Sequence, residues 1–183
     1  MKKAEARELI LKKRLELTEN DRLELSQKII AALTSNFELT NKKLSVFLPI
    51  ERFVEIDTKP LLEIEGAKFG LPIVQAEGEM KHVLYESEEQ IEVSDWGIPE
   101  PTYGDEVEAV FFDFVFVPLL AFDDKGYRVG YGKGFYDRFL ARCKPDCVFI
   151  GLSFFEAVES IEDLNEFDAR LHYCVTPQTV HKF

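Results

Sequence analysis

Long apolar runs and a cysteine framework are missing from this 183-residue chain. No apolar stretch approaches the ~20 residues that a membrane-spanning helix needs, and the charged start Met1–Glu5 lacks the apolar segment of a secretory signal. The three cysteines, Cys143, Cys147 and Cys174, are an odd number, which predicts no disulfide framework. We therefore expect a protein of the reducing cytoplasm that does not bind a membrane.

Common phosphate-binding and catalytic motifs are also missing. A P-loop needs G-x-x-x-x-G-K-[ST], but Tyr127 stands at its first glycine and Gly134 at its last position. The spacing of Gly130, Gly132 and Gly134 is G-x-G-x-G, not the dinucleotide fingerprint. There is no G-x-S-x-G motif, and the histidines are isolated, so a nucleophilic triad is not expected.

Positive charge is scarce, since the formal net charge is −12. Such a protein should repel nucleic acid, and we expect no nucleic-acid partner. The stretch 125–144 opposes this trend, with Asp137 as its single acid and six bases: Lys125, Arg128, Lys133, Arg138, Arg142 and Lys144. This basic island fits a small polyanion, while the alternative interpretation is a helix with a solvated basic face.

The basic island overlaps a glycine-rich stretch, 117–140, that predicts a strand, a loop and the start of a helix. A glycine loop that leads into a helix offers backbone N–H groups and a positive dipole end to an anion. Arg128 and Lys133 lie within the loop, which indicates a phosphate. Asp137 follows one turn into the helix, where a carboxylate could hold the magnesium of that phosphate.

Along the rest of the chain, helices alternate with short apolar strands. Composition and capping residues predict helices over 3–16 and 19–33, from Thr58, and over 135–143; the expected strands are 44–48, 67–74, 81–85, 109–118, 147–152 and 173–176. Residues 96–101 should be irregular, because Pro99 and Pro101 lack donors. This alternation predicts one α/β three-layer αβα domain over 1–183, with ligands at the carboxyl ends of the strands.

Several other residues allow a structural and a functional interpretation. Lys3 and Arg7 share a helix face, where a surface ion pair with neighbouring glutamates is the plainer interpretation. Asp168, just before the last strand, could be a turn cap or a second metal-binding carboxylate. Trp96 could anchor its loop by packing or line a pocket for a ring ligand.

Taken together, these residues resemble the 5-formyltetrahydrofolate cyclo-ligase family, also called methenyltetrahydrofolate synthetases. The similarity is concentrated in a proline-ended strand, Phe122-Asp123, a Gly-x-Arg-x-Gly step and Gly132-Lys133-Gly134-Phe135-Tyr136-Asp137. It extends to Lys3 and Arg7, to Glu55–Thr58, to the Trp96–Pro101 loop and to 150–154. It therefore covers nearly the whole chain, with a mostly parallel or mixed central sheet of the NagB/RpiA/CoA-transferase-like fold and helices of about 3–34 on the core.

The resemblance implies an ATP- and Mg²⁺-dependent cyclisation of 5-formyltetrahydrofolate to 5,10-methenyltetrahydrofolate, with release of ADP and phosphate. Phosphorylation of the formyl oxygen creates a leaving group, and folate N10 then attacks. ATP is a co-substrate, the partners are small molecules, and we expect a monomer. Alternatives are a folate- or nucleotide-binding module without turnover, and a related-fold isomerase or transferase that ignores ATP.

The resemblance also implies roles for individual residues. The catalytic residues are Lys133, Arg128 and Tyr136, and Mg²⁺ is held by Asp137 and Asp168. ATP is bound by Lys3, Arg7, Arg128, Gly130, Tyr131, Gly132, Lys133, Gly134, Phe135 and Tyr136. The folate is bound by Leu48, Glu55, Trp96, Tyr131, Lys133, Gly134 and Phe135.

Three positions depart from the family pattern. Tyr131 stands where some members carry arginine, which removes one phosphate-binding charge. Two extra residues lie between Leu48 and Glu55, so that Glu51 is an alternative for the acid that faces the pterin. His172 stands where aspartate is common, which removes a second acidic contact.

Overall fold

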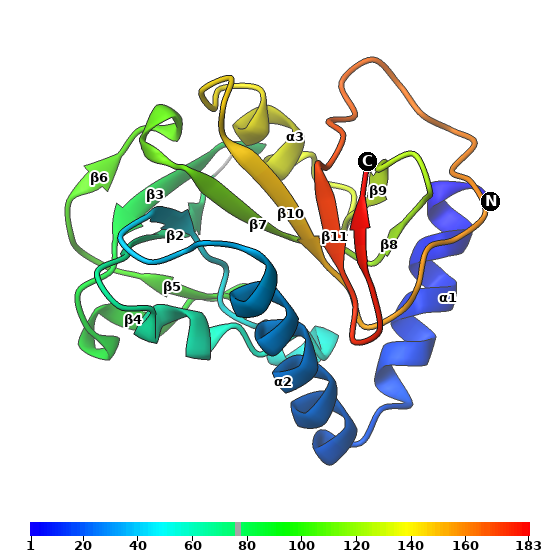
Figure 1. The fold of residues 1–183 in the computed structure, drawn as a ribbon, viewed down its shortest axis with the longest axis horizontal. Helices are drawn as coiled ribbons and strands as arrows, with labels where there is room; N and C mark the ends of the chain where they lie inside the picture. Colours follow the sequence, from blue (N-terminus) through cyan, green and yellow to red (C-terminus); the bar gives the residue numbers. More distant parts are fainter. Residues whose placement is uncertain (76–77) are drawn as a thin grey trace.

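An eight-stranded mixed sheet forms the centre of the computed structural model, which describes residues 1–75 and 78–183 (Figure 1). The strand order is β12-β11-β10-β7-β1-β2-β3-β6; the middle strands from β11 to β2 run parallel, and antiparallel strands complete both edges. The bounds are β1 Lys43–Ser45, β2 Lys68–Val74, β3 Met80–Leu84, β6 Glu106–Val107, β7 Phe114–Pro118, β10 Val148–Leu152, β11 Tyr173–Val175 and β12 Val180–Lys182.

Side chains of the central strand β7 alternate between two cores, as the period of a strand requires. Phe116 belongs to the core under α2 (Glu19–Asn36), and Val115 and Val117 to the core under α3 (Phe135–Leu140). Helices thus cover both faces of the sheet, which confirms the predicted α/β class. Across the described residues, no helix has both the length and the apolar composition of a membrane span.

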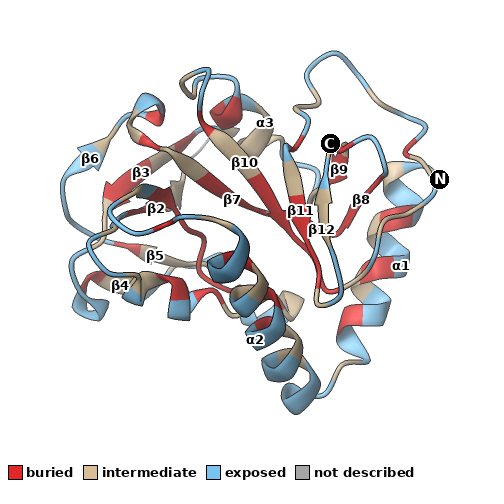
Figure 2. Cartoon of the chain, viewed as in Figure 1, coloured by how far each residue is buried: buried red, intermediate tan, exposed pale blue. Residues whose placement is uncertain are grey.

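The first helix, α1 (Lys3–Leu15), lies to one side of the large sheet, on the hairpin of β8 (Ala121–Phe122) and β9 (Arg128–Val129) (Figure 1). Its buried face alternates with exposed residues along the helix in Figure 2. Ala6 and Ile10 of this face pack in one cluster with Leu120 and Val129. The N-terminal helix is therefore fixed directly over the start of the glycine loop.

The structure corrects the expected bounds of four segments. The first strand ends at Ser45 rather than at residue 48. The strand predicted over 109–118 is a 3₁₀ turn at Ala109–Phe111 followed by β7. The last expected helix ends at Leu140 rather than residue 143, and the helix expected from Thr58 is the 3₁₀ segment Lys59–Glu63. The segments Glu51–Phe53 and Glu88–Gln90 are also 3₁₀ turns.

The loop expected at 96–101 contains a short strand. β5 (Pro99–Pro101) pairs with β4 (Ile91–Val93) in a separate two-stranded ribbon. A strand with a single pairing partner leaves its other edge without ladder bonds, so that residues lacking N–H donors are tolerated there. The prediction that 96–101 is irregular was therefore wrong for Pro99–Pro101.

Candidate active site

A cavity of ≈900 Å³ opens at the carboxyl ends of the middle strands. Leu48 follows β1, Val74 ends β2 and Pro118 ends β7, and all three line it. This is where the α/β topology places a ligand. The cavity brings together every residue that the sequence proposed for ligand binding or catalysis: Lys3, Arg7, Leu48, Glu55, Trp96, Arg128, Gly130, Tyr131, Gly132, Lys133, Gly134, Phe135, Tyr136, Asp137 and Asp168.

The glycine loop connects β9 to α3 along one wall of the cavity. Gly132 and Gly134 have φ angles of 91° and 70°, a left-handed conformation that favours glycine. Because α3 has six residues, its dipole is smaller than that of the helix expected over 135–143. The attraction of this loop for an anion must therefore come mainly from its cationic side chains.

Helix α1 contributes two cations to the same wall. Arg7 Nε donates to the carbonyl oxygen of Gly130 at 2.9 Å, and Lys3 Nζ reaches Asp168 at 2.6 Å. Neither residue forms the surface ion pair with a neighbouring glutamate that local pattern favoured, as far as the described residues extend. The helix thus directs Lys3 and Arg7 into the cavity.

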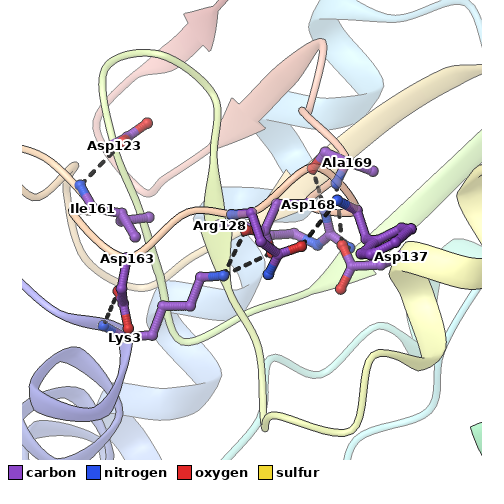
Figure 3. A network of polar contacts seen from close by, with 10 residues as sticks. Lys3, Asp123, Arg128, Asp137, Ile161, Asp163, Asp168 and Ala169 are labelled. Atoms are coloured by element: carbon purple, nitrogen blue, oxygen red, sulfur yellow. Dashed lines mark hydrogen bonds and ion pairs between the residues drawn. The ribbon is translucent and has the colours of Figure 1, made fainter.

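A partly buried polar network joins β9, α3 and the segment before β11 (Figure 3). Arg128 Nη2 donates to Asp137 Oδ1 at 2.7 Å, and its Nη1 donates to the carbonyl oxygen of Ala169. Asp137 Oδ1 also accepts from the N–H of Ala169 at 3.2 Å. Burial lowers the pKa of Arg128, while the adjacent Asp137 raises it. Arg128 therefore acts partly as a cross-link that holds Asp137 beside the 163–169 segment.

The two candidate metal ligands, Asp137 and Asp168, are each paired with a cation, Arg128 and Lys3 respectively. Among residues 1–75 and 78–183, no three His, Cys, Asp or Glu side chains are grouped to hold a metal. Magnesium rarely uses such a cage and is commonly bound by one or two carboxylates together with substrate phosphates. The two carboxylates fit that second kind of site.

Glu55, just after the 3₁₀ turn Glu51–Phe53, presents a buried carboxylate to the cavity. Its Oε2 accepts from the N–H of Ile50 at 2.8 Å and its Oε1 from the Tyr131 hydroxyl at 2.5 Å. Burial raises the pKa of Glu55, and these two hydrogen bonds oppose that rise. Glu51, the alternative acid, has a 71% exposed side chain paired with Arg22. The geometry thus favours Glu55 as the acid that faces a ligand.

Aromatic rings line the cavity beside Glu55. Tyr131 stacks on Phe53, with ring centroids 4.7 Å apart. Trp96 is 54% exposed and lines the cavity, so it is not the packed anchor of its loop. The hydroxyl of Tyr136 is buried without a hydrogen-bond partner in the described residues, and burial raises its pKa. These rings provide flat apolar surfaces and an unsatisfied donor.

Sequence reasoning missed three residues that shape the site. Arg14, on α1, is 2% exposed and donates to the Tyr131 hydroxyl at 3.0 Å. Phe53 supplies the ring under Tyr131. Arg138 Nη2 donates to the carbonyl of Lys133 at 2.7 Å. The seven-residue spacing from Arg7 to Arg14 places both on one helix face, and this spacing was the available signal.

Comparisons with known proteins point to one family. The model of the 5-formyltetrahydrofolate cyclo-ligase family matches residues 1–177. A 5-formyltetrahydrofolate cyclo-ligase from Mycoplasma genitalium is 28% identical over 174 residues, which cover 92% of this chain and 94% of that protein. The mouse enzyme of the same name is 34% identical over 129 residues, 65% of this chain, and the match spans 62% of the mouse enzyme's length.

A solved structure extends the likeness to the whole fold. The 5,10-methenyltetrahydrofolate synthetase of Aquifex aeolicus has a TM-score of 0.84 and 34% identity, covering 100% of this chain and 93% of that one. Because the family match covers almost the entire chain, including every residue named around the cavity, the resemblance expected from the glycine stretch is confirmed. The chain belongs to the 5-formyltetrahydrofolate cyclo-ligase family.

Proposed function

We propose that this chain catalyses the ATP-dependent cyclisation of 5-formyltetrahydrofolate to 5,10-methenyltetrahydrofolate, with release of ADP and phosphate. The observation that carries the proposal is the cavity in which the cations Lys3, Arg7 and Lys133 meet the buried acid Glu55 and the aromatic rings. Cations suit the polyphosphate of a nucleotide, and a carboxylate beside flat rings suits the N–H donors of a pterin. One glycine loop borders both sets of residues.

In the proposed reaction the γ-phosphoryl group moves to the formyl oxygen of the folate, and N10 then attacks the activated carbon as phosphate leaves. No protein nucleophile is required, so the chain acts by positioning and by charge stabilisation. Lys133 is exposed on the glycine loop and would stabilise the charge on the transferring group. Arg128 and the Tyr136 hydroxyl would complete the donors around the transferring oxygens.

Glu55 and Leu48 would contact the pterin, and Trp96 and Phe135 would pack against the flat parts of the folate. Lys3 and Arg7 would bind the outer phosphates, while the backbone of Gly130, Gly132 and Gly134 allows close approach of both ligands. Asp137 and Asp168 would hold Mg²⁺ together with phosphate oxygens. Bound Mg²⁺ neutralises phosphate charge; the protein's own contribution is to orient the two carboxylates through Arg128 and Lys3.

We further infer that the protein is a cytoplasmic monomer. The three cysteines are free thiols, which supports a reducing compartment. Light scattering at assay concentration tests the oligomeric state, and a stable dimer would overturn this inference. Cell fractionation in the source cell tests the compartment.

The test of the reaction is direct. Purified protein with Mg²⁺, ATP and 5-formyltetrahydrofolate should generate the methenyl chromophore and ADP in equal amounts. Omission of either substrate should abolish both signals. Tight folate or nucleotide binding without ADP release would refute turnover and support a binding module.

A further inference from the structure

Arg14 lies at the end of a buried hydrogen-bonded chain that reaches the cavity. Its Nη1 donates to the Tyr131 hydroxyl at 3.0 Å, and that hydroxyl donates to Glu55 Oε1 at 2.5 Å. Its Nη2 donates to the carbonyl of Leu119 at 2.5 Å, which fixes the guanidinium just beyond β7. Two hydrogen bonds therefore hold the guanidinium in place, and the Tyr131 hydroxyl links it to the Glu55 carboxylate.

Several charged or titratable groups face Glu55 from the elements packed around it. Arg14 comes from α1, Arg22 from α2, Tyr131 from the glycine loop and Tyr136 from α3. Arg22 Nε donates to the backbone carbonyl of Glu55 at 2.8 Å, and its remaining nitrogens pair with Glu51. The side-chain carboxylate of Glu55 is therefore reached by the Tyr131 hydroxyl, and Arg14 is the cation behind that hydroxyl.

A buried carboxylate that recognises N–H donors must stay ionised and keep its orientation. Burial of Glu55 favours the protonated form, and a protonated carboxyl would place its own O–H donor against the donors of the ligand. A donor hydroxyl held by a cation opposes protonation. The hydroxyl also fixes the carboxylate plane, because the Tyr131 ring is itself held by stacking on Phe53.

We propose that Arg14 is a positioning residue for folate binding, which acts through the Tyr131 hydroxyl to hold the Glu55 carboxylate in the charge state and orientation that the ligand requires. The inference rests on the proposed function and adds a residue that does not itself line the cavity. Because Lys3, Arg7 and Arg14 share α1, the helix that reaches toward the nucleotide also sets the acid of the folate site.

The test compares Arg14→Met, Arg14→Lys and Tyr131→Phe, with the exposed neighbour Lys12→Met as the control on the same helix. Each variant is measured for its folate KM, its ATP KM and the pH profile of kcat/KM, with 5-formyltetrahydrofolate as the folate. Equilibrium dialysis of the folate across the same pH range gives a readout that does not depend on turnover. Circular dichroism establishes that each variant is folded.

Arg14→Met and Tyr131→Phe should each raise the folate KM about tenfold, since each removes one hydrogen-bonding link to a charged group. The acid limb of kcat/KM should move to higher pH by about one unit in both. The ATP KM of Arg14→Met should stay within about twofold of the wild-type value, as for Lys12→Met. Arg14→Lys, which keeps the positive charge, should show a smaller rise in folate KM and a smaller shift of the acid limb than Arg14→Met. The double variant should add little to either single change, because both act along one chain of contacts.

An unchanged folate KM and acid limb in the folded variants would overturn the proposal. In Arg14→Met, an ATP KM that rises as much as the folate KM would also overturn it, since that result indicates general damage to α1. If Arg14→Met does not fold, Tyr131→Phe decides between these outcomes because it retains the stacked ring. Absence of ATP-dependent product from the wild type would refute the proposed function, whereas folate dialysis would still test the role of Arg14.

Discussion

Lys3 Nζ lies 2.7 and 2.6 Å from the two carboxylate oxygens of Asp168, although 165 positions separate the residues in sequence. The side chains are only 13% and 12% exposed, so the pair is less screened than a surface ion pair. Asp168 Oδ2 also accepts from the N–H of Asn165 at 2.7 Å. Nucleotide phosphates would compete with Asp168 for Lys3, and Mg²⁺ would compete with Lys3 for Asp168. Binding of the nucleotide with Mg²⁺ should therefore break the Lys3–Asp168 ion pair, so that Lys3 contacts phosphate and Asp168 contacts the metal.

Lys3→Met should raise the ATP KM about tenfold, equivalent to roughly 1.4 kcal/mol, because one phosphate-binding cation is lost. The folate KM should change little, since Lys3 contacts Asp168 rather than the Glu55 side of the cavity. Initial rates at varied MgATP measure the effect. Lys12→Met, which makes the same chemical change at an exposed position of α1, is the matched control. Equal effects of the two substitutions would remove Lys3 from the nucleotide site.

Lys133→Ala should lower kcat about 10²–10³-fold, or roughly 3–4 kcal/mol, if its ammonium stabilises the transferring phosphoryl group. The thermal midpoint should not change, because the side chain is exposed. Single-turnover measurements separate the chemical step from product release. Lys125→Ala removes an exposed lysine from the β8–β9 turn, outside the cavity lining, and should retain full activity. A Lys133 variant with near-normal kcat would contradict the assigned role.

The residues of the glycine stretch were predictable because they form one local pattern that resembles a known family, and Lys3, Glu55 and Asp168 only because that resemblance extends along the chain. The rest of the site was not predictable. Arg14 is an ordinary arginine in a charged helix until the fold places it against Tyr131. Phe53 lies in a 3₁₀ turn whose C-cap residue, Val54, has a φ of 48°, a conformation that sequence pattern does not predict for valine. Contacts between distant segments depend on tertiary packing, which period and propensity do not encode.

In the fold, too, local sequence pattern predicted some elements and tertiary packing decided others. Apolar runs and caps predicted the long helices and six of the eight strands of the large sheet. In α2, for example, the Thr18 hydroxyl accepts from the N–H of Asp21 at 3.1 Å. The edge strands β6 and β12 have two and three residues and carry too few side chains for a pattern. The β8–β9 hairpin was missed for a related reason: its turn contains Gly126, which read as part of the loop.

Gly132→Ala should destabilise the protein by about 1–2 kcal/mol, since alanine would adopt a left-handed conformation at a φ of 91°. A Cβ there would also lie 3.3 Å from the guanidinium carbon of Arg7, which would have to shift. Gly130→Ala is the matched control for stability, because a Cβ at that position meets nothing within 4 Å. Urea titrations compare the free energies of unfolding. Equal stabilities would show that the loop relaxes without strain.

Glu55→Gln should raise the folate KM by about 10–100-fold, the loss expected for hydrogen bonds to a charged acceptor. Glu51→Gln should leave that KM unchanged, because Glu51 points to Arg22 and does not line the cavity. Initial rates at varied 5-formyltetrahydrofolate measure both. The two substitutions have identical chemistry four residues apart, so they decide which acid faces the pterin. A larger effect at Glu51 would reverse the assignment.

His82 should make the fold sensitive to mild acid. It is fully buried, its Nε2 lies 2.8 Å from Ser45 Oγ, and its ring stacks on Phe139 with centroids 4.2 Å apart. Burial, with a smaller contribution from the charge of Arg142, lowers the pKa of His82 from 6.5 to about 3. The unfolded chain therefore binds a proton between these two values that the folded chain does not, so that stability falls as pH decreases below 6.5 and levels off below about 3.

Between about pH 7.5 and 5.5 this one group should remove roughly 1.4 kcal/mol from the free energy of unfolding. In His82→Gln the absolute stability falls, but the difference between the two pH values should shrink by that amount, because the new side chain does not titrate. His172→Gln, at a far more exposed position where partial burial of the ring also lowers the histidine pKa, should reduce the difference less. Urea titrations at both pH values measure it, and an unchanged difference in His82→Gln would mean that the pKa of this histidine is the same in the folded and the unfolded protein.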